Sequence, residues 1–293
     1  MAATIACIAG EEIYRQWDAG RIQGRSLGGR TTPFGTSGEV FLVEADPQPY
    51  FLLPRYGAGI LKTAPHKVND RANLYALKDL GVEMVLAWGS GGAVTHNIAV
   101  GDLVILDDVI DMTHQRKSTF FEDSPLGFLR QFPVFCPALR RVVGGVLHDM
   151  KLVYQGAGTA AVCEGPRLET PAEVRMLAAL GAEIVTHAFV PEVFLAKELQ
   201  LCYAAFCYVV NYAETGSPYR PFAAGELFGG LTQQSDGDRL AAAVGAMSRI
   251  VAAVAASSKD AAPECDCRQT MARHVQDYSL PRDWRKWFET GQT

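Results

Sequence analysis

Residues 71–92 read RANLYALKDLGVEMVLAWGSGG, and this stretch carries the pattern that decides the fold. Arg71–Leu80 has apolar residues at helical spacing and stops at Gly81, and the apolar run Met84–Ala87 then predicts a strand. Glycines follow at Gly89-Ser90-Gly91-Gly92. Such glycines either bring backbone N–H groups to a phosphate or ribose, or allow a tight turn with positive φ. A helix, a strand and a glycine-rich turn in this order are typical of an α/β protein.

Short β-branched runs alternate with helical patterns along most of the remaining chain. A capping box, Thr170-Pro171-Ala172-Glu173, starts a helix that ends at Leu180–Gly181, and the Ala-rich segment 235–257 predicts a long helix packed on the sheet. We therefore expect an α/β fold, a single domain with a mixed, largely parallel central sheet flanked by helices. The other predicted strands are residues 4–8, 40–43, 103–106, 160–163, 183–185 and 203–210.

The chain changes character near residue 258. No linker that would separate two domains occurs before this point. Residues 265–293 are polar and aromatic without clear periodicity. The sequence thus predicts one domain over residues 1–258 and a C-terminal extension over residues 259–293.

The composition favours a small molecule as the partner. With 293 residues, of which 48% are hydrophobic and 20% charged, the chain can bury a large core, which excludes a disordered protein. The formal net charge is −5 without any Lys/Arg-rich run, so neither nucleic acid nor a membrane surface is expected to bind. Met1–Gly10 lacks the basic start of a secretory signal, and we expect no membrane-spanning stretch. The protein is expected in the cytoplasm.

The seven cysteines fit a reducing compartment, because their number is odd and most of them lie in apolar segments. Cys265 and Cys267 are separated by one residue, and only His274 lies near them in the sequence. Because these are too few ligands for zinc, we expect no metal site. A disulfide between the tails of neighbouring subunits, or no bond at all, is favoured instead.

Three polar positions follow predicted strands. The loop Glu164–Thr170, which contains Leu168, lies between a strand and the capped helix, where its side chains face either a cleft or solvent. His187 lies at the carboxyl end of a strand, where open α/β sheets place ligands, although a lone His is often structural. Asn211 ends the strand 203–210, where it either offers a donor and an acceptor to a purine edge or forms a turn.

Several longer motifs occur in a definite order: Thr32-Pro33-Phe34-Gly35, Arg55-Tyr56-Gly57, Pro65-His66-Lys67-Val68-Asn69, Ala72–Lys78, Gly101–Ile105, Phe120-Phe121-Glu122-Asp123, Glu164-Gly165-Pro166-Arg167 and Pro191-Glu192-Val193. Over roughly residues 4–255 this order resembles methylthioadenosine phosphorylases, which belong to the purine nucleoside phosphorylase superfamily. The resemblance implies a homotrimeric pentosyltransferase of purine salvage. Such an enzyme uses phosphate as co-substrate to split a purine nucleoside into a free purine and a sugar 1-phosphate, with no metal or organic cofactor.

The resemblance places phosphate at five positions, of which only one keeps the family residue: Arg55, Tyr56, Gly89, Glu11 and Ala188. Arg55 is retained, whereas Tyr56 replaces a His and Gly89 and Ala188 replace hydroxyl residues. Ala9-Gly10-Glu11-Glu12 stands where the family has a Gly-rich loop with a hydroxyl. A carboxylate about 4 Å from a phosphate oxygen would cost about 4 kcal/mol at an effective dielectric of ~20. These departures predict that phosphate is bound poorly or not at all, unless nearby residues compensate.

The resemblance also implies the residues that bind the nucleoside: Ser90, Gly91, Leu168, His187, Asn211, Ala213 and Phe222. His187 replaces a ribose-binding Met, and Asn211-Tyr212-Ala213 replaces the Asp-x-Asp that reads adenine. Asn211 is the expected catalytic residue, and its amide suits a 6-oxopurine because it can donate to O6. Phe222, with Leu227 and Phe228, would make the pocket for the 5′ group apolar.

Two other functions are compatible with these residues. In a nucleoside hydrolase on the same scaffold, Glu11 or Glu12 would orient a water toward the anomeric carbon. In a binding protein without catalysis, aromatic residues would form a wall for a flat ligand. The residues of that wall would be Tyr56, Trp88, Phe189 and Tyr212. The accepted base and 5′ group stay open at this stage.

Overall fold

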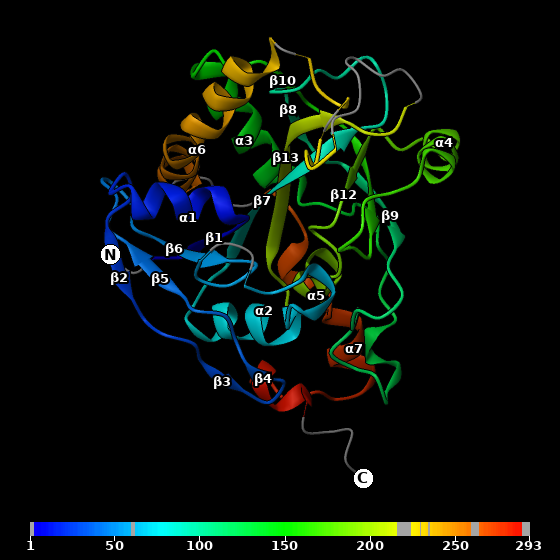
Figure 1. Cartoon of the computed structure of the whole chain (residues 1–293). Helices are drawn as coiled ribbons and strands as arrows, with labels where there is room; N and C mark the ends of the chain where they lie inside the picture. Colours follow the sequence, from blue (N-terminus) through cyan, green and yellow to red (C-terminus); the bar gives the residue numbers. More distant parts are fainter. Residues whose placement is uncertain are drawn as a thin grey trace.

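A central sheet runs through the molecule, and helices cover both of its faces (Figure 1). The computed structural model describes residues 3–59, 62–215, 224–228, 230–233, 235–258 and 264–288. In these residues the sheet has eleven strands, and both parallel and antiparallel neighbours occur. This confirms the predicted α/β fold with a mixed, largely parallel sheet.

The strands of the large sheet follow the order β10-β8-β13-β7-β1-β6-β5-β2, and β12, β11 and β9 continue it from the end of β7. A separate small hairpin pairs β3 with β4. The bounds are β1 (Ile5–Ala9), β2 (Gly24–Ser26), β3 (Thr31–Thr32), β4 (Gly35–Thr36), β5 (Phe41–Val43), β6 (Tyr50–Pro54), β7 (Met84–Ala93), β8 (Leu103–Ile105), β9 (Asp108–Met112), β10 (Tyr154–Gln155), β11 (Thr159–Cys163), β12 (Ile184–Thr186) and β13 (Cys202–Tyr212).

Strands β7 and β13 are long and form the centre of the sheet. They pair in parallel from Met84 and Cys202 onward, and the register shifts between Val209 and Asn211. Near its end, β7 also pairs with β12, in the antiparallel sense. Because a bulge bends its strand, this shift turns the last residues of β13 relative to the rest of the sheet.

Two helical layers enclose the sheet. Helices α1, α3 and α6 pack together on one face, and α2 packs on α5 on the other face, while the apolar side of α4 packs over β11 and β12 (Figure 1). The helices are α1 (Glu11–Asp18), α2 (Asp70–Asp79), α3 (Pro137–Asp149), α4 (Pro171–Ala179), α5 (Glu192–Glu198), α6 (Asp236–Ser258) and α7 (Ala272–Asp277), with short 3₁₀ helices η1 (Pro65–Lys67), η2 (Pro125–Gly127), η3 (Cys267–Gln269) and η4 (Trp284–Phe288). The predicted capping box of α4 is confirmed.

The glycines after Ala87 do not form the predicted turn. They continue β7 to Ala93, and none of Gly89, Gly91 and Gly92 has a positive φ. A Cβ added to Gly91 would lie 2.5 Å from Ile184 Cγ2 and 2.7 Å from Cys207 Sγ. Glycine is therefore required because the neighbouring strands approach closely, and not because the chain turns.

We expected no stretch that could span a membrane. By length and composition alone, this expectation was wrong. Helix α6 has 23 residues and is apolar enough to cross a bilayer. In the structure it packs against α1, α3 and the sheet, and it buries residues such as Met247, Ile250 and Val254. The apolar side chains of α6 therefore contribute to the core of the domain.

Residues 271–288 pack onto the face of the sheet that carries α2 and α5. Met271, Leu280 and Trp287 are buried in the same core. The ring of Phe288 lies 5.3 Å from the ring of Phe34, measured between centroids. The predicted boundary at residue 258 stays a prediction, but residues 264–288 form helices that cover this core.

Candidate active site

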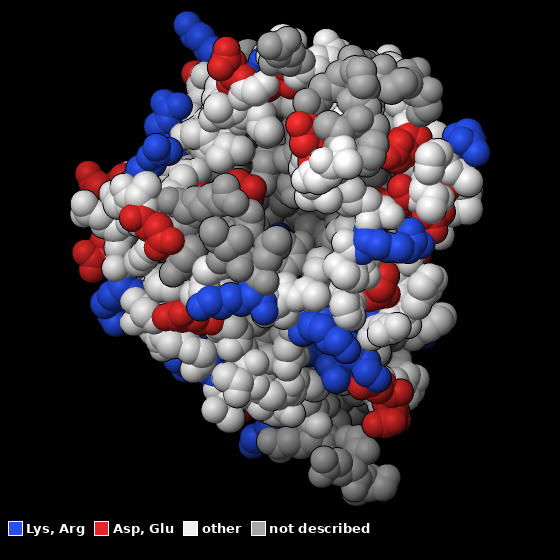
Figure 2. Space-filling view, viewed as in Figure 1, with Lys and Arg blue, Asp and Glu red and all other residues white. Residues whose placement is uncertain are grey.

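A cavity of about 310 Å³ opens where β7, β12 and β13 end. Figure 2 shows that this side of the molecule is hollowed near its middle, with acidic and basic residues around the hollow. Its wall is mainly apolar with a few polar groups, which is usual for a small-molecule site. The lining residues are Tyr56, Pro65, Ser90, Gly91, Gly92, Pro166, Leu168, Glu169, Val174, Val185, Thr186, His187, Val210, Asn211, Ala213, Glu214, Leu227, Phe228 and Leu231.

The cavity unites most of the residues predicted to bind the nucleoside, although they are distant in the sequence. Leu227 and Phe228, which were predicted to make the 5′ pocket apolar, line it as well. Phe222 lies outside the described residues. The predicted residues that line the cavity are Tyr56, Ser90, Gly91, Leu168, His187, Asn211 and Ala213.

Asn211 owes its place at the cavity to the bulge in β13. The side chain is 6% exposed, and a Cβ added to Gly92 would lie 2.7 Å from Asn211 Oδ1. Gly92 thus leaves room for the carboxamide. Because the amide can both donate and accept, it can face the polar edge of a base.

His187 is held beside the cavity by two independent contacts. Its Nε2 lies 3.3 Å from Glu169 Oε1. Burial raises the pKa of Glu169, but the interactions with His187 and the other hydrogen bonds of the carboxylate together outweigh it, and the net shift is downward. Gly165 has a positive φ and lies against the imidazole, where a Cβ would come within 3.1 Å of Nδ1. This position therefore requires glycine.

Arg116 joins the loops on both sides of His187. Its guanidinium donates to the carbonyls of His187 and Val190 at 2.9 and 2.6 Å, and to those of Cys163 and Glu164 at 3.1 and 2.8 Å. This role could not be predicted from the sequence, because an isolated Arg in a loop has no pattern that marks its partners. Thr186, also missed, donates to the Ser90 carbonyl at 2.7 Å and so connects β12 with β7.

Arg55 lies below the cavity wall and does not line it. Its Nε and Nη2 donate to both oxygens of Glu192, and Nη1 donates to the carbonyl of Trp88 at 2.7 Å. Tyr203 Oη donates to Glu192 Oε2 at 2.7 Å. The ring of Phe189 covers the guanidinium, with 5.4 Å between Cζ and the ring centroid. Burial lowers the pKa of Arg55, but the Glu192 carboxylate outweighs it and the net shift is upward.

Of the other predicted phosphate positions, Tyr56 lines the cavity, whereas Gly89 and Ala188 are not among its described lining residues. Gly89 and Ala188 are in contact range, since a Cβ on Gly89 would come within 2.9 Å of Ala188 Cβ and of Phe189 Cζ. The side chain of Glu11 is outside the described part of the structure. Their roles at phosphate stay predictions.

Glu12 and most of the predicted aromatic wall are also found elsewhere. Burial, together with the Glu12 carboxylate, raises the pKa of the Tyr208 hydroxyl, and Glu12 itself lines a groove shared by α1 and α6. Trp88 and Phe189 are fully buried in the core. Of the four aromatic residues expected to form a wall, only Tyr56 is among the lining residues.

The charges at the cavity are acidic. Glu169 and Glu214 line it, and the described lining residues include no Lys or Arg. Among the described residues, the one group of His, Cys, Asp or Glu side chains close enough to share a metal ion lies away from this cavity. The cavity is therefore suited to an uncharged ligand more than to an anion.

The sequence and structure are similar to known proteins. A family model described as the phosphorylase superfamily matches residues 29–256. A probable S-methyl-5′-thioinosine phosphorylase of Methanothermobacter thermautotrophicus is 37% identical over 215 residues, which is 73% of each chain. A probable 6-oxopurine nucleoside phosphorylase of Thermococcus kodakarensis is 37% identical over 221 residues, covering 73% of this chain and 81% of the relative.

A solved methylthioadenosine phosphorylase from an antarctic soil metagenomic library has the same fold. Its TM-score is 0.81 at 24% identity, and the superposition covers 99% of this chain and 98% of that one. The resemblance predicted from the motifs is confirmed by these comparisons.

Proposed function

The chain belongs to the phosphorylase superfamily, and on that premise we propose that it is a purine nucleoside phosphorylase, a pentosyltransferase. The observation that carries the proposal is the single cavity that unites Ser90, His187 and Asn211. Relatives that cover more than two thirds of the chain are named as phosphorylases of purine nucleosides.

The reaction would proceed by displacement at the anomeric carbon. A phosphate oxygen forms the new bond to C1′ while the bond from C1′ to N9 breaks, and its electron pair goes to the purine. The purine takes up a proton from solvent at N7 and leaves as the neutral base. The sugar is released as the 1-phosphate, and no oxidant or reductant is needed. Stabilising charge on the departing base is the main catalytic requirement.

Asn211 would meet this requirement at the purine. Its amide N–H can donate to O6 and its Oδ1 can accept from a protonated N7, which favours a 6-oxopurine such as hypoxanthine. A deprotonated Asp would instead accept from a 6-amino group. His187, held by Glu169, would contact the ribose, and Leu227 and Phe228 would contact an apolar 5′ group such as methylthio.

Among the residues that the structure describes, no cation on the cavity wall would hold phosphate. Arg55 is engaged with Glu192, so the Ser90 hydroxyl and nearby backbone N–H groups would have to supply most of the contacts. Hydrogen bonds from neutral donors are about half as strong as those from charged ones. We therefore expect a high KM for phosphate.

Nucleoside hydrolysis is a second candidate function, and the same lack of cations favours it. A water molecule would then replace phosphate as the nucleophile and would need a base near C1′. The carboxylates among the described residues of the cavity wall are Glu169 and Glu214. Of the two residues considered from sequence, Glu12 lines another groove, and the side chain of Glu11 lies outside the described part of the structure.

Release of base, followed by liquid chromatography with methylthioinosine, inosine and methylthioadenosine at increasing phosphate, tests these alternatives. The proposal predicts release that rises with phosphate and does not saturate at low concentration. Equal release without phosphate would support the hydrolase. Binding of nucleosides without any release would leave a binding protein.

We further propose that the enzyme is a homotrimer of the cytoplasm that acts in purine salvage and needs no organic cofactor. The family resemblance supports the trimer, and the seven unpaired thiols are compatible with a reducing compartment. Sedimentation velocity tests the trimer, for which a mass of one chain, 31.8 kDa, would be a contradiction.

A further inference from the structure

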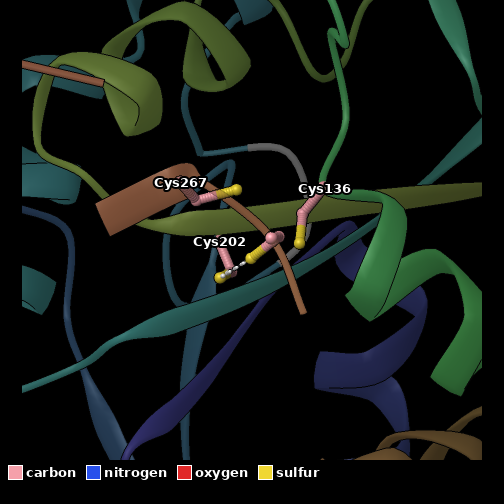
Figure 3. A group of neighbouring side chains, drawn as sticks. Cys136, Cys202 and Cys267 are labelled. Atoms are coloured by element: carbon pink, nitrogen blue, oxygen red, sulfur yellow. Dashed lines mark hydrogen bonds between the residues drawn. The ribbon is translucent and has the colours of Figure 1, made fainter. Parts of the chain in front are cut away.

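Four cysteines from three distant parts of the chain lie together near the start of β13, at the opposite end of this strand from the cavity residue Asn211. Cys136 immediately precedes α3, Cys202 begins β13, and Cys265 and Cys267 belong to the C-terminal segment. All four sulfur atoms lie within 4.8 Å of one another, and those of Cys202 and Cys265 are 3.6 Å apart. Figure 3 shows the thiols pointing toward a common centre.

This spacing matches a metal site better than disulfide bonds. Zinc bound by four thiolates has Zn–S distances of about 2.3 Å, so sulfur atoms at the corners of the tetrahedron are about 3.8 Å apart. A disulfide needs sulfur atoms about 2.05 Å apart. All seven cysteines of the chain are free thiols in the structure.

We propose that these four cysteines bind one Zn²⁺ ion in a closed, structural site. Four sulfur ligands fill the tetrahedral coordination of zinc and leave no position for substrate. Soft thiolate ligands also select zinc over magnesium, calcium and manganese.

The surroundings of the cluster are suited to thiolates. The backbone N–H of Leu139, in the first turn of α3, donates to Cys136 Sγ at 3.4 Å. The positive end of this 13-residue helix therefore lies against one ligand.

The site would fasten the C-terminal segment to the sheet. Two ligands come from that segment and two from the domain core, so the metal joins parts of the chain more than 60 residues apart. Cys202 and Asn211 stand near opposite ends of β13, a separation of about 30 Å at ~3.3 Å per residue. The metal would therefore stabilise the fold without taking part in the reaction.

Sequence alone could not predict this site, because Cys136 and Cys202 are far from Cys265 and Cys267. His274, the one additional ligand that the sequence suggested, is not a member of the cluster. The proposal departs from the expectation of no metal. It also differs from a disulfide between subunits, since all four thiols meet within one chain.

Zinc content of the purified full chain tests the proposal. Elemental analysis by mass spectrometry should find about one Zn per chain in the wild type and in the control Cys163→Ser, whose cysteine lies outside the cluster. The double variant Cys265→Ser/Cys267→Ser should retain less than about a tenth of this zinc. Both substitutions lie in the C-terminal segment, so the domain core keeps its own cysteines.

Two further measurements distinguish the loss of bound zinc from a general loss of folding. X-ray absorption of the wild type should show four sulfur neighbours at about 2.3 Å. A chelator should lower the Tm of the wild type by several degrees and leave that of the double variant unchanged, because metal bound only by the folded state stabilises it. Zinc-free wild type, zinc retained by the double variant, or disulfides among these cysteines in non-reduced peptide maps would overturn the proposal.

Discussion

Asn211 is the residue that we propose recognises the base. Replacing it with Ala should lower kcat/KM for 6-oxopurine nucleosides about 100-fold or more, because losing one hydrogen-bond donor to developing charge costs about 2.7–4 kcal/mol. Steady-state kinetics with inosine and methylthioinosine provide the measurement.

Asn211→Asp is the matched variant, since it keeps the size of the side chain. It should raise the ratio of activity on 6-amino to 6-oxo nucleosides. Activity of Asn211→Ala within twofold of the wild type would remove the residue from base recognition.

Arg55 provides a second test at the scale of the residue. Arg55→Met should destabilise the protein by about 3–5 kcal/mol, because it leaves the Glu192 carboxylate buried without its partner. Urea unfolding measures this loss. The double variant Arg55→Met/Glu192→Gln should recover part of it.

A different result would assign Arg55 to phosphate binding. If Arg55→Met unfolds like the wild type and mainly raises the KM for phosphate, the guanidinium serves phosphate as the family resemblance implies. The buried ion pair between Arg55 and Glu192 would then have to open when phosphate binds.

Residues at strand ends could be predicted, and residues defined by distant partners could not. His187 and Asn211 follow strands that the sequence pattern marks, and both line the cavity. The partner of Arg55 is Glu192, 137 positions later, so no local pattern joins them. Arg116 was missed for the same reason, because its partners are backbone carbonyls of two loops.

Strand β7 must pass close to its neighbours, and this predicts different effects for two glycines. Gly91→Ala should destabilise by about 1–3 kcal/mol, because its Cβ would overlap with Ile184 and Cys207. The control Gly145→Ala lies in α3, where nothing is within 4 Å of an added Cβ. It should stabilise by about 0.5–1 kcal/mol, since Ala favours a helix.

Chemical denaturation of both variants gives the comparison. A Gly91→Ala protein as stable as Gly145→Ala would show that β7 has space at this point. The glycines would then have to be explained by the ligand and not by the packing of the sheet.

Helix α5 carries a carboxyl that predicts a pH dependence of stability. Burial raises the pKa of Glu198 from 4.5 to about 7, although Thr119 and the backbone N–H of Phe120 donate to it. Between these two values the folded state keeps a proton that the unfolded state loses. The carboxyl therefore contributes a loss of stability that grows as pH rises through this window.

Glu198→Gln removes this ionisation. The Tm of the variant relative to the wild type should be higher at about pH 8 than at about pH 5, as followed by thermal unfolding. Exposed Glu44→Gln serves as the control and should show no such change with pH. A constant difference between Glu198→Gln and the wild type would contradict the shift.

Long elements could be predicted from periodicity, whereas short or extended ones could not. The helix predicted at 71–80 is α2, and the strand predicted at 203–210 is β13 with small changes at its ends. Strands such as β3 and β4 have only two residues each, too few for a periodic pattern. The extension of β7 through glycines depends on packing between strands, which local propensity does not report.

At the scale of the whole molecule, the fold brings the site together from one edge of the sheet and closes the opposite side with the C-terminal segment. The fold class could be predicted because alternating strands and helices allow few arrangements. The packing of Met271 and Trp287 against the core could not be predicted, because the segment has no clear periodicity of its own. The four-cysteine cluster could not be predicted either, because its members are far apart in the sequence.

We propose that phosphate, and not water, receives the sugar. Phosphorus NMR of the protein with inosine or methylthioinosine and phosphate tests it most directly. If the sugar is transferred to phosphate, we expect a sugar 1-phosphate resonance that grows in step with free hypoxanthine. Hypoxanthine that accumulates with free sugar, while the phosphate signal stays unchanged, would contradict it.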